Sequence, residues 1–207
     1  PLFLLNKHTL DVIKEQENIK YIYIDPGHGG KDGGAISNTG IYEKDINLLI
    51  SYRLKSYLEN CGYNVKMTRY GDYDLASHGS KNRKNEDINK RIDLINNQDV
   101  ILYISIHCNI YTSQMIKGAQ TFYKDNEENK MLANIIQNKL KCILKNTTRD
   151  SKKITGKYLI DNSQTIGCLV EVGFLSNPEE LALLTDKIYQ DQLAYCIYLG
   201  IIEYLGI

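Results

Sequence analysis

Two histidines and two glutamates, each in its own segment of the chain, are the residues whose types could do metal chemistry: His28, Glu43, His107 and Glu171. Catalytic zinc in hydrolases commonly takes three His or carboxylate ligands and leaves a fourth position to water. His28, Glu43 and His107 would supply such a set, with Glu171 left as a nearby carboxylate. Because the short H-E-x-x-H motif is absent, the ligands must come from separate elements.

His28 lies in a glycine-rich turn, D-P-G-H-G-G-K-D-G-G, that runs from Asp25 to Gly34. The apolar residues 21–24 before it predict a buried strand, so the turn follows a strand's carboxyl end, where open α/β sheets keep their chemistry. Glycines there permit positive φ and close backbone approach. A phosphate loop is the alternative, but neither the G-x-G-x-x-G nor the G-x-x-x-x-G-K-[ST] frame fits. The turn is therefore expected to place one side chain, that of His28.

Each of the other three residues also has an ordinary explanation. Glu43 begins a helix predicted over residues 43–61, where a carboxylate is favoured by the helix dipole. His107 ends a strand predicted over residues 100–107 and is expected beside a buried wall. Glu171 interrupts an apolar run, where it needs a proton, a metal ion or an ion pair with Lys or Arg. Only the combination favours a metal site.

Strands and helices alternate along the chain, which predicts the α/β class. We expect a single domain with a central, mixed and mostly parallel sheet of about six strands, flanked by helices on both faces. The remaining strands are expected over residues 63–69, 118–123 and 169–172 and near Tyr158. The remaining helices are expected over residues 86–97, 131–143 and 189–204. Residues 70–85 are expected to form a long loop. The cations at its borders, Arg69, Arg83 and Lys84, could contact substrate carboxylates or lie in solvent.

Composition argues against several classes of protein. The 25 basic residues balance 25 acidic ones, which argues against a nucleic-acid partner. No apolar run reaches the length of about 18 residues that a membrane span needs. Five cysteines without C-x-x-C spacing do not indicate a disulfide framework, and we expect burial of those in apolar segments, namely Cys108, Cys168 and Cys196.

Four blocks resemble, in kind and in order, the zinc-dependent N-acetylmuramoyl-L-alanine amidases of bacterial cell-wall hydrolysis. They are D-P-G-H-G-G from Asp25, then Glu43, then S-I-H-C-N from Ser105, and E-V-G-F-L-S-N from Glu171. The resemblance covers residues 21–204, nearly the whole chain. Within the family it is strongest to the sporulation and germination branch, which prepares muramic-δ-lactam in the spore cortex.

The resemblance implies that residues 19–207 form a zinc amidase catalytic domain and that residues 1–18 are a leader remnant or tail. It implies cleavage of the amide between the muramic acid lactyl group and L-Ala of the peptidoglycan stem peptide. The implied location is extracytoplasmic, in the cell wall or the spore intermembrane space, with the export leader not present in this chain. An accessory lipoprotein partner is also expected, because some clostridial spore amidases act with one.

The resemblance further implies roles for the four residues. Zn²⁺ would be bound by His28, Glu43 and His107, and Glu171 would be the catalytic carboxylate. The ligating imidazoles should donate their second N–H to an acceptor, for which Asp25 or nearby backbone carbonyls are the candidates. Two other functions stay open: a catalytically silent wall-binding or regulatory module of the same fold, and a zinc peptidase that acts on the stem peptide.

Overall fold

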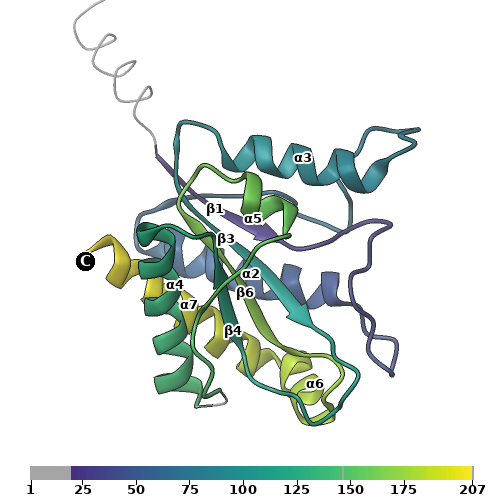
Figure 1. Cartoon of the computed structure of the whole chain (residues 1–207), viewed down its shortest axis with the longest axis vertical. Helices are drawn as coiled ribbons and strands as arrows, with labels where there is room; N and C mark the ends of the chain where they lie inside the picture. The colour runs from purple at the N-terminus through teal and green to yellow at the C-terminus, as the bar shows by residue number, and fades with distance from the viewer. Residues whose placement is uncertain (1–19, 146, 207) are drawn as a thin grey trace, which may run out of the picture.

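A six-stranded sheet forms the centre of the structure, a computed structural model that describes residues 20–145 and 147–206 (Figure 1). The predicted leader or tail, residues 1–18, lies outside the described residues. The strands are β1 (Tyr21–Pro26), β2 (Asn64–Met67), β3 (Val100–Asn109), β4 (Gln120–Tyr123), β5 (Lys152–Lys153) and β6 (Gly167–Phe174). Their order across the sheet is β2-β1-β3-β6-β4-β5. Every neighbouring pair is parallel except β4 and β6, which confirms the predicted mixed and mostly parallel sheet.

Helices cover both faces of this sheet, as predicted (Figure 1). They are α2 (Glu43–Asn60), α3 (Arg83–Ile95), α4 (Glu127–Lys139), the π-helical turn η1 (Leu140–Leu144), α5 (Tyr158–Asn162), α6 (Pro178–Thr185) and α7 (Lys187–Leu205). Helices α2 and α4 both pack on α7 and bury the larger core with one face of the sheet. Helices α3 and α5 pack on each other over the opposite face.

Strand alternation sorts the central residues between the two cores. Ile104 and Ile106 of β3 are buried in the larger core, whereas Tyr103 belongs to the smaller core under α3 and α5. His107 and Glu171 continue the smaller-core face at the carboxyl ends of β3 and β6. His107 and Glu171 therefore lie on the sheet face that α3 and α5 cover, whereas Glu43 begins α2, which packs on the opposite face.

The strand predicted near Tyr158 is wrong, because this residue begins helix α5. Leu159 and Ile160 are both buried in the smaller core. Successive strand residues point to opposite faces, so one core can receive this pair from a helical turn but not from a strand. Helix α6 was not predicted; Asn177 caps it by accepting a hydrogen bond from the amide of Glu180.

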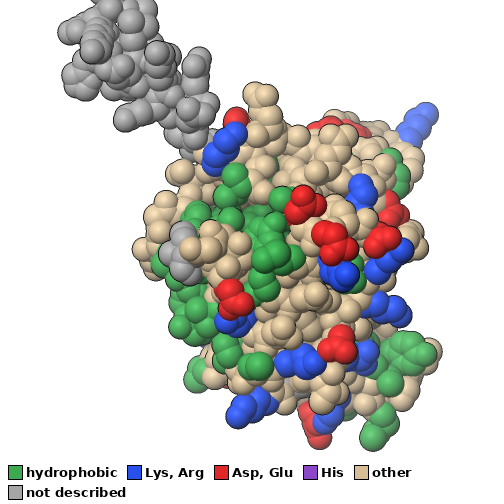
Figure 2. Space-filling model, turned by 60° about the vertical axis from the view of Figure 1, so that its left-hand side comes forward, with side chains coloured by type: hydrophobic (Ala, Val, Ile, Leu, Met, Phe, Trp, Pro, Cys, Tyr) green, Lys and Arg blue, Asp and Glu red, His purple; other side chains and the backbone are tan. Residues whose placement is uncertain are grey.

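The remaining sequence expectations concern the surface and the cysteines. Cys108, Cys168 and Cys196 are buried, as predicted, and all five cysteines are free in the structure. The face seen in Figure 2 carries Lys and Arg side chains interspersed with Asp and Glu, in keeping with the balanced charge of the chain. Within the described ranges, none of the helices has both the length and the apolar character that a membrane crossing requires.

Candidate metal centre and active-site cavity

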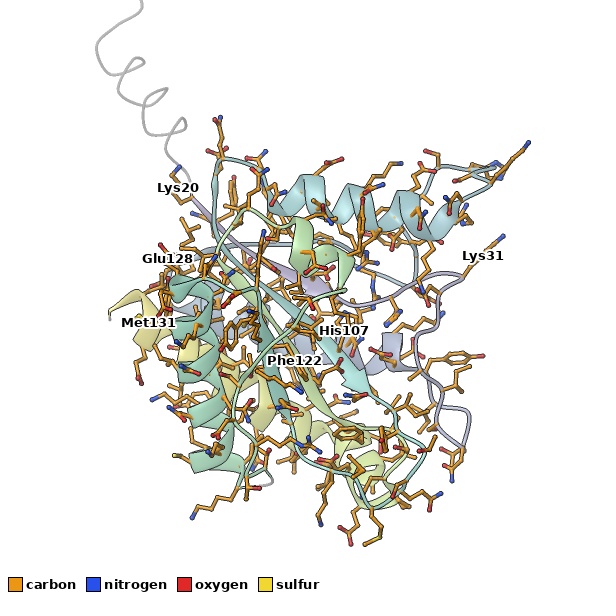
Figure 3. All side chains as sticks on the ribbon, in the orientation of Figure 1. Lys20, Lys31, His107, Phe122, Glu128 and Met131 are labelled. Atoms are coloured by element: carbon orange, nitrogen blue, oxygen red, sulfur yellow. The ribbon has the colours of Figure 1, made fainter. Side chains whose placement is uncertain are left out.

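His28, Glu43 and His107 converge at the carboxyl end of the sheet. Oε1 of Glu43 lies 3.3 Å from Nε2 of His28 and 2.9 Å from Nδ1 of His107. One potential ligand atom from each residue lies within 4.8 Å of the others. His107 extends from the carboxyl-terminal part of β3 toward α2, the helix that Glu43 begins (Figure 3). The structure thus brings together the three predicted metal ligands from three separate elements.

The donor set and its spacing fit Zn²⁺. Two imidazole nitrogens and a carboxylate oxygen are ligands that zinc takes, and bonds of about 2.0–2.1 Å in a tetrahedron place neighbouring donors roughly 3.3 Å apart. Nδ1 of His28 faces Oδ2 of Asp32 at 3.0 Å, so its Nε2 is left to face Glu43. A carboxylate on the second nitrogen is the arrangement usual for metal-binding histidines.

Asp25 does not accept a hydrogen bond from the second ring nitrogen of His28, contrary to one of the sequence expectations. Its carboxylate accepts hydrogen bonds from Thr68 Oγ1 at 2.6 Å, Ser105 Oγ at 2.7 Å and Arg91 Nη1 at 2.7 Å. These partners hold Asp25 beneath the turn. Asp32, four residues after His28, is the carboxylate that contacts Nδ1 of His28 in place of Asp25. It reaches this nitrogen because the turn folds back on itself between Gly29 and residue 32.

The electrostatics of the centre are those of a cation site. Burial raises the pKa of Glu43, but hydrogen bonds from His107 and His28 outweigh this and hold it well below its usual range. Burial lowers the pKa of His28, yet its contacts with Asp32 and Glu43 raise that pKa to about 9. The carboxylates beside the two imidazoles therefore stabilise positive charge between His28, Glu43 and His107.

Glycines make the close approach of these side chains possible. A Cβ on Gly27 would lie 2.3 Å from Cε1 of His107, and a Cβ on Gly34 would lie 2.6 Å from Oε2 of Glu43. Side chains at these two positions would displace His107 or Glu43. His28 itself has a φ of 62°, a left-handed conformation that a non-glycine residue adopts at a cost of about 1–3 kcal/mol.

Glu43 is fixed by donors from three segments besides the histidines. Its Oε1 accepts hydrogen bonds from the amide of Cys108 at 3.1 Å and from Nδ2 of Asn47 at 3.3 Å. Its Oε2 accepts one from the amide of Ala35 at 2.8 Å. A carboxylate in the first turn of a helix is common, but this one is buried and aimed at two histidines, so helix capping alone does not explain it.

Glu171 lies directly beside His107 on the neighbouring strand, with the two Cα atoms paired in register. The Glu171 side chain is buried, and its Oε2 has no hydrogen-bond partner among the described residues. Burial is the main cause that raises the pKa of Glu171, and the charge of Glu43 adds to it. No Lys or Arg of residues 20–145 and 147–206 forms an ion pair with it, which removes the alternative left open by the sequence.

One cavity of about 760 Å³ contains all four residues. Its walls come from the first half of α3, the start of α5 and the end of β3, and they include Lys84, Asn89, Lys157 and Tyr158. Of the three cations at the loop borders, which the sequence left open to substrate carboxylates or to solvent, Lys84 lines the cavity. Arg69 is buried against backbone carbonyls and Arg83 is paired with Asp74, and neither lines the cavity.

Sequence reasoning missed the buried arginines beneath the turn. Arg91 forms ion pairs with Asp25 at 2.7 Å and with Asp87 at 2.9 Å. A signal was present, because Arg91 shares helical spacing with Ile88 and Ile95 on the face of α3 that packs on the sheet. An arginine at such a position requires buried partners.

The chain is similar to known proteins over most of its length. A germination-specific N-acetylmuramoyl-L-alanine amidase of Bacillus subtilis (strain 168) is 49% identical over 189 residues, which cover 89% of this chain and 79% of that protein. The CwlD amidase from Clostridioides difficile, solved in complex with the GerS lipoprotein, superposes with a TM-score of 0.87 at 37% identity over 90% of this chain and 98% of that one. The catalytic domain of CwlV from Bacillus (Paenibacillus) polymyxa superposes with a TM-score of 0.80 at 30% identity over 91% and 99%.

These relatives share the α/β fold with its six-stranded, mostly parallel sheet. The family model described as N-acetylmuramoyl-L-alanine amidase matches residues 22–203, the whole span from the first strand through most of α7. That span carries all of the site residues and both cores. The resemblance seen in the sequence rested on four short blocks, and the family match and the relatives extend it to the whole domain. This chain is a member of the N-acetylmuramoyl-L-alanine amidase family of hydrolases.

Proposed function

We propose that this chain hydrolyses the amide between the muramic acid lactyl group and L-Ala of the peptidoglycan stem peptide. In this proposal Zn²⁺ is held by His28, Glu43 and His107, and Glu171 is the catalytic base. The observation that carries the proposal is the position of Glu171. It is a buried carboxylate with an unpartnered oxygen, in register beside His107 and in the same cavity as the three convergent side chains.

Cleavage of an amide needs an activated water, a stabilised oxyanion and a proton for the departing amine. Zn²⁺ bound at this site would lower the pKa of water toward about 7 and polarise the scissile carbonyl. Glu171 would accept the proton of the attacking water and then deliver it to the leaving nitrogen. A raised pKa suits that role, because the group must hold the proton between the two transfers.

The cavity supports a substrate of this size and polarity. Its volume of about 760 Å³ falls in the range of about 300–1,000 Å³ found for ligand sites. Lys84 and Lys157 on its walls suit the carboxylates of a stem peptide, and Tyr158 and Asn89 offer an aromatic ring and an amide to the rest of the substrate.

The biological role proposed here is formation of muramic-δ-lactam in the spore cortex, outside the cytoplasm. The 49% identity to a germination-specific amidase supports it. An accessory lipoprotein partner is part of the proposal, supported by the similar amidase that was solved in complex with one.

Mass spectrometry of products from defined muropeptides, with and without added Zn²⁺, tests the activity. We expect free stem peptide with an L-Ala amino terminus, formed only when Zn²⁺ is present. Fragments cut within the stem peptide would instead identify a peptidase. No product at all, with Zn²⁺ and with candidate lipoprotein partners added, would identify a catalytically silent module.

A further inference from the structure

Two buried arginines hold the backbone on either side of His28. Arg69, after β2, and Arg91, on α3, are 1% and 2% exposed. Both guanidinium groups donate to the carbonyl oxygen of Pro26, each at 2.9 Å. They come from two separate segments of the chain and meet at the point where β1 ends.

After Pro26, each arginine donates to the carbonyl oxygen of a different peptide plane. Nη2 of Arg69 donates to the carbonyl of Gly27 at 3.0 Å, which fixes the plane before the His28 Cα. Asn47 Nδ2 donates to the same oxygen at 3.2 Å. Nη2 of Arg91 donates to the carbonyl of His28 at 2.7 Å, which fixes the plane after that Cα. The φ and ψ angles of a residue are the relation between these two planes, so together the donors determine the conformation of His28.

That conformation needs support because it is a left-handed one, with a φ of 62° on a residue that carries a Cβ. Such conformations persist where the surroundings over-determine them. The planar guanidinium fork allows one side chain to bind several carbonyls in fixed directions, which an ammonium group cannot do. Substitution by Lys therefore keeps the charge and removes the geometry.

The two arginines differ in how their charge is balanced. Arg91 has Asp25 and Asp87 as ion-pair partners. Arg69 makes no ion pair within the described residues and donates to the carbonyls of Pro26, Gly27, Lys44 and Gly71. A buried guanidinium with carbonyl partners alone is costly to desolvate, and its contacts converge on this turn.

We infer that Arg69 and Arg91 act as a pair of positioning residues that fix His28 in its left-handed conformation before any metal binds, and thereby set the metal affinity of the site. The inference rests on the proposed function in so far as the metal is concerned. The arginines touch neither the cavity's metal ligand atoms nor the reacting bond; they act through the backbone of His28.

The test compares Arg69→Lys and Arg91→Lys with the parent and with Arg149→Lys. Arg149 is a matched control, because it also donates to a backbone carbonyl, that of Lys117 at 3.0 Å, but on the β4 side of the protein. Zn²⁺ affinity is measured by competition with a chromogenic chelator, and thermal unfolding is followed on the metal-free proteins. We expect Zn²⁺ affinity to fall about 10- to 100-fold in each of the two variants and to stay at the parental value in the control.

A merely structural role would lower the melting temperature and leave the affinity of the folded protein unchanged, and that result would overturn the inference. Backbone NMR of the metal-free parent provides a measurement that needs no variant to fold. We expect His28 to keep a positive φ without metal; a negative φ would overturn the inference as well. A parent that binds no Zn²⁺ but keeps the positive φ would instead contradict the proposed metal site and leave the positioning role supported.

Discussion

His107 and Glu171 face each other across the β3–β6 pairing, register partners at the carboxyl end of two parallel strands. In a parallel pair such partners point to the same face of the sheet. The His107 side chain lies in the cluster with Glu43 and His28. Oε2 of Glu171 has no hydrogen-bond partner among the described residues. The sheet itself therefore sets the separation between a proposed metal ligand and the proposed base.

Glu171→Gln should separate metal binding from catalysis. The amide keeps the shape of the side chain but cannot accept the water's proton, so we expect hydrolysis of a defined muropeptide to fall about 10²- to 10⁴-fold. The Zn²⁺ content after dialysis should equal that of the parent. His107→Ala, by contrast, should lose both zinc and activity. Glu179→Gln is the control, because Glu179 is an exposed carboxylate at the start of α6. Parental activity in Glu171→Gln would show that the base is a different group.

Gly27→Ala should disturb the site through a single methyl group. The added Cβ would lie 2.3 Å from the His107 ring, so the ring or the turn must shift. We expect a loss of about 1–3 kcal/mol in the free energy of unfolding, as for other overpacked sites, and a Zn²⁺ affinity at least about 10-fold weaker.

Gly40→Ala is the matched control for this prediction. Gly40 has a φ of 84° and nothing within 4 Å of an added Cβ. It should cost about 1–2 kcal/mol of stability through backbone strain and leave Zn²⁺ affinity unchanged. Equal affinities in the two variants would mean that the His107 ring does not depend on the clearance at Gly27.

Two of the four candidate site residues could be named from the sequence because each departs from its local pattern. Glu171 interrupts a run of apolar residues, and His107 ends one. In the structure, the register of β3 with β6 places both on one face of the sheet. Local patterns sufficed for these two residues, whereas His28 in its turn and Glu43 at its helix start stood out only in combination with them.

The supports of the site could not be predicted in the same way. Whether Asp25 or Asp32 reaches His28 depends on the left-handed turn at His28, which no periodicity encodes. Arg69 and Arg91 are far apart in sequence and meet only because loop and helix close over the same carbonyls. The strand expected near Tyr158 failed for a related reason, since two adjacent buried residues fit a short strand or a single helical turn equally well until the core is known.

Asp32→Asn should weaken metal binding without removing a ligand. The Asp32 carboxylate accepts from Nδ1 of His28 and thereby directs Nε2 toward Glu43. An amide can present its NH₂ group to that nitrogen and so favour the wrong tautomer. We expect Zn²⁺ affinity to fall about 10- to 100-fold, measured by chelator competition. Asp125→Asn, at an exposed ion pair with Lys153, should behave as the parent. An unchanged affinity in Asp32→Asn would leave His28 oriented by its backbone alone.

The pair of Asp25 with Arg91 should make stability depend on acid pH. Burial raises the pKa of Asp25, but Arg91, Thr68 and Ser105 outweigh it and lower that pKa to about 2 from 3.8. A carboxyl whose pKa is lower in the folded state adds stability that is complete above its unfolded pKa and is lost as the pH falls through the folded value. The window is therefore about pH 4 down to about pH 2, and the difference in pKa corresponds to about 2 kcal/mol.

Urea unfolding of the metal-free protein at several pH values measures this contribution. We expect the parent to be more stable than Asp25→Asn above about pH 4 and the difference to shrink by about 2 kcal/mol as the pH approaches 2. Asp125→Asn serves again as the control and should follow the parent throughout, because its carboxylate is exposed. If the parent and Asp25→Asn lost stability in parallel across this window, the proton taken up on acid unfolding would belong to another carboxylate. The ion pair beneath the turn would then contribute packing and orientation but no pH dependence.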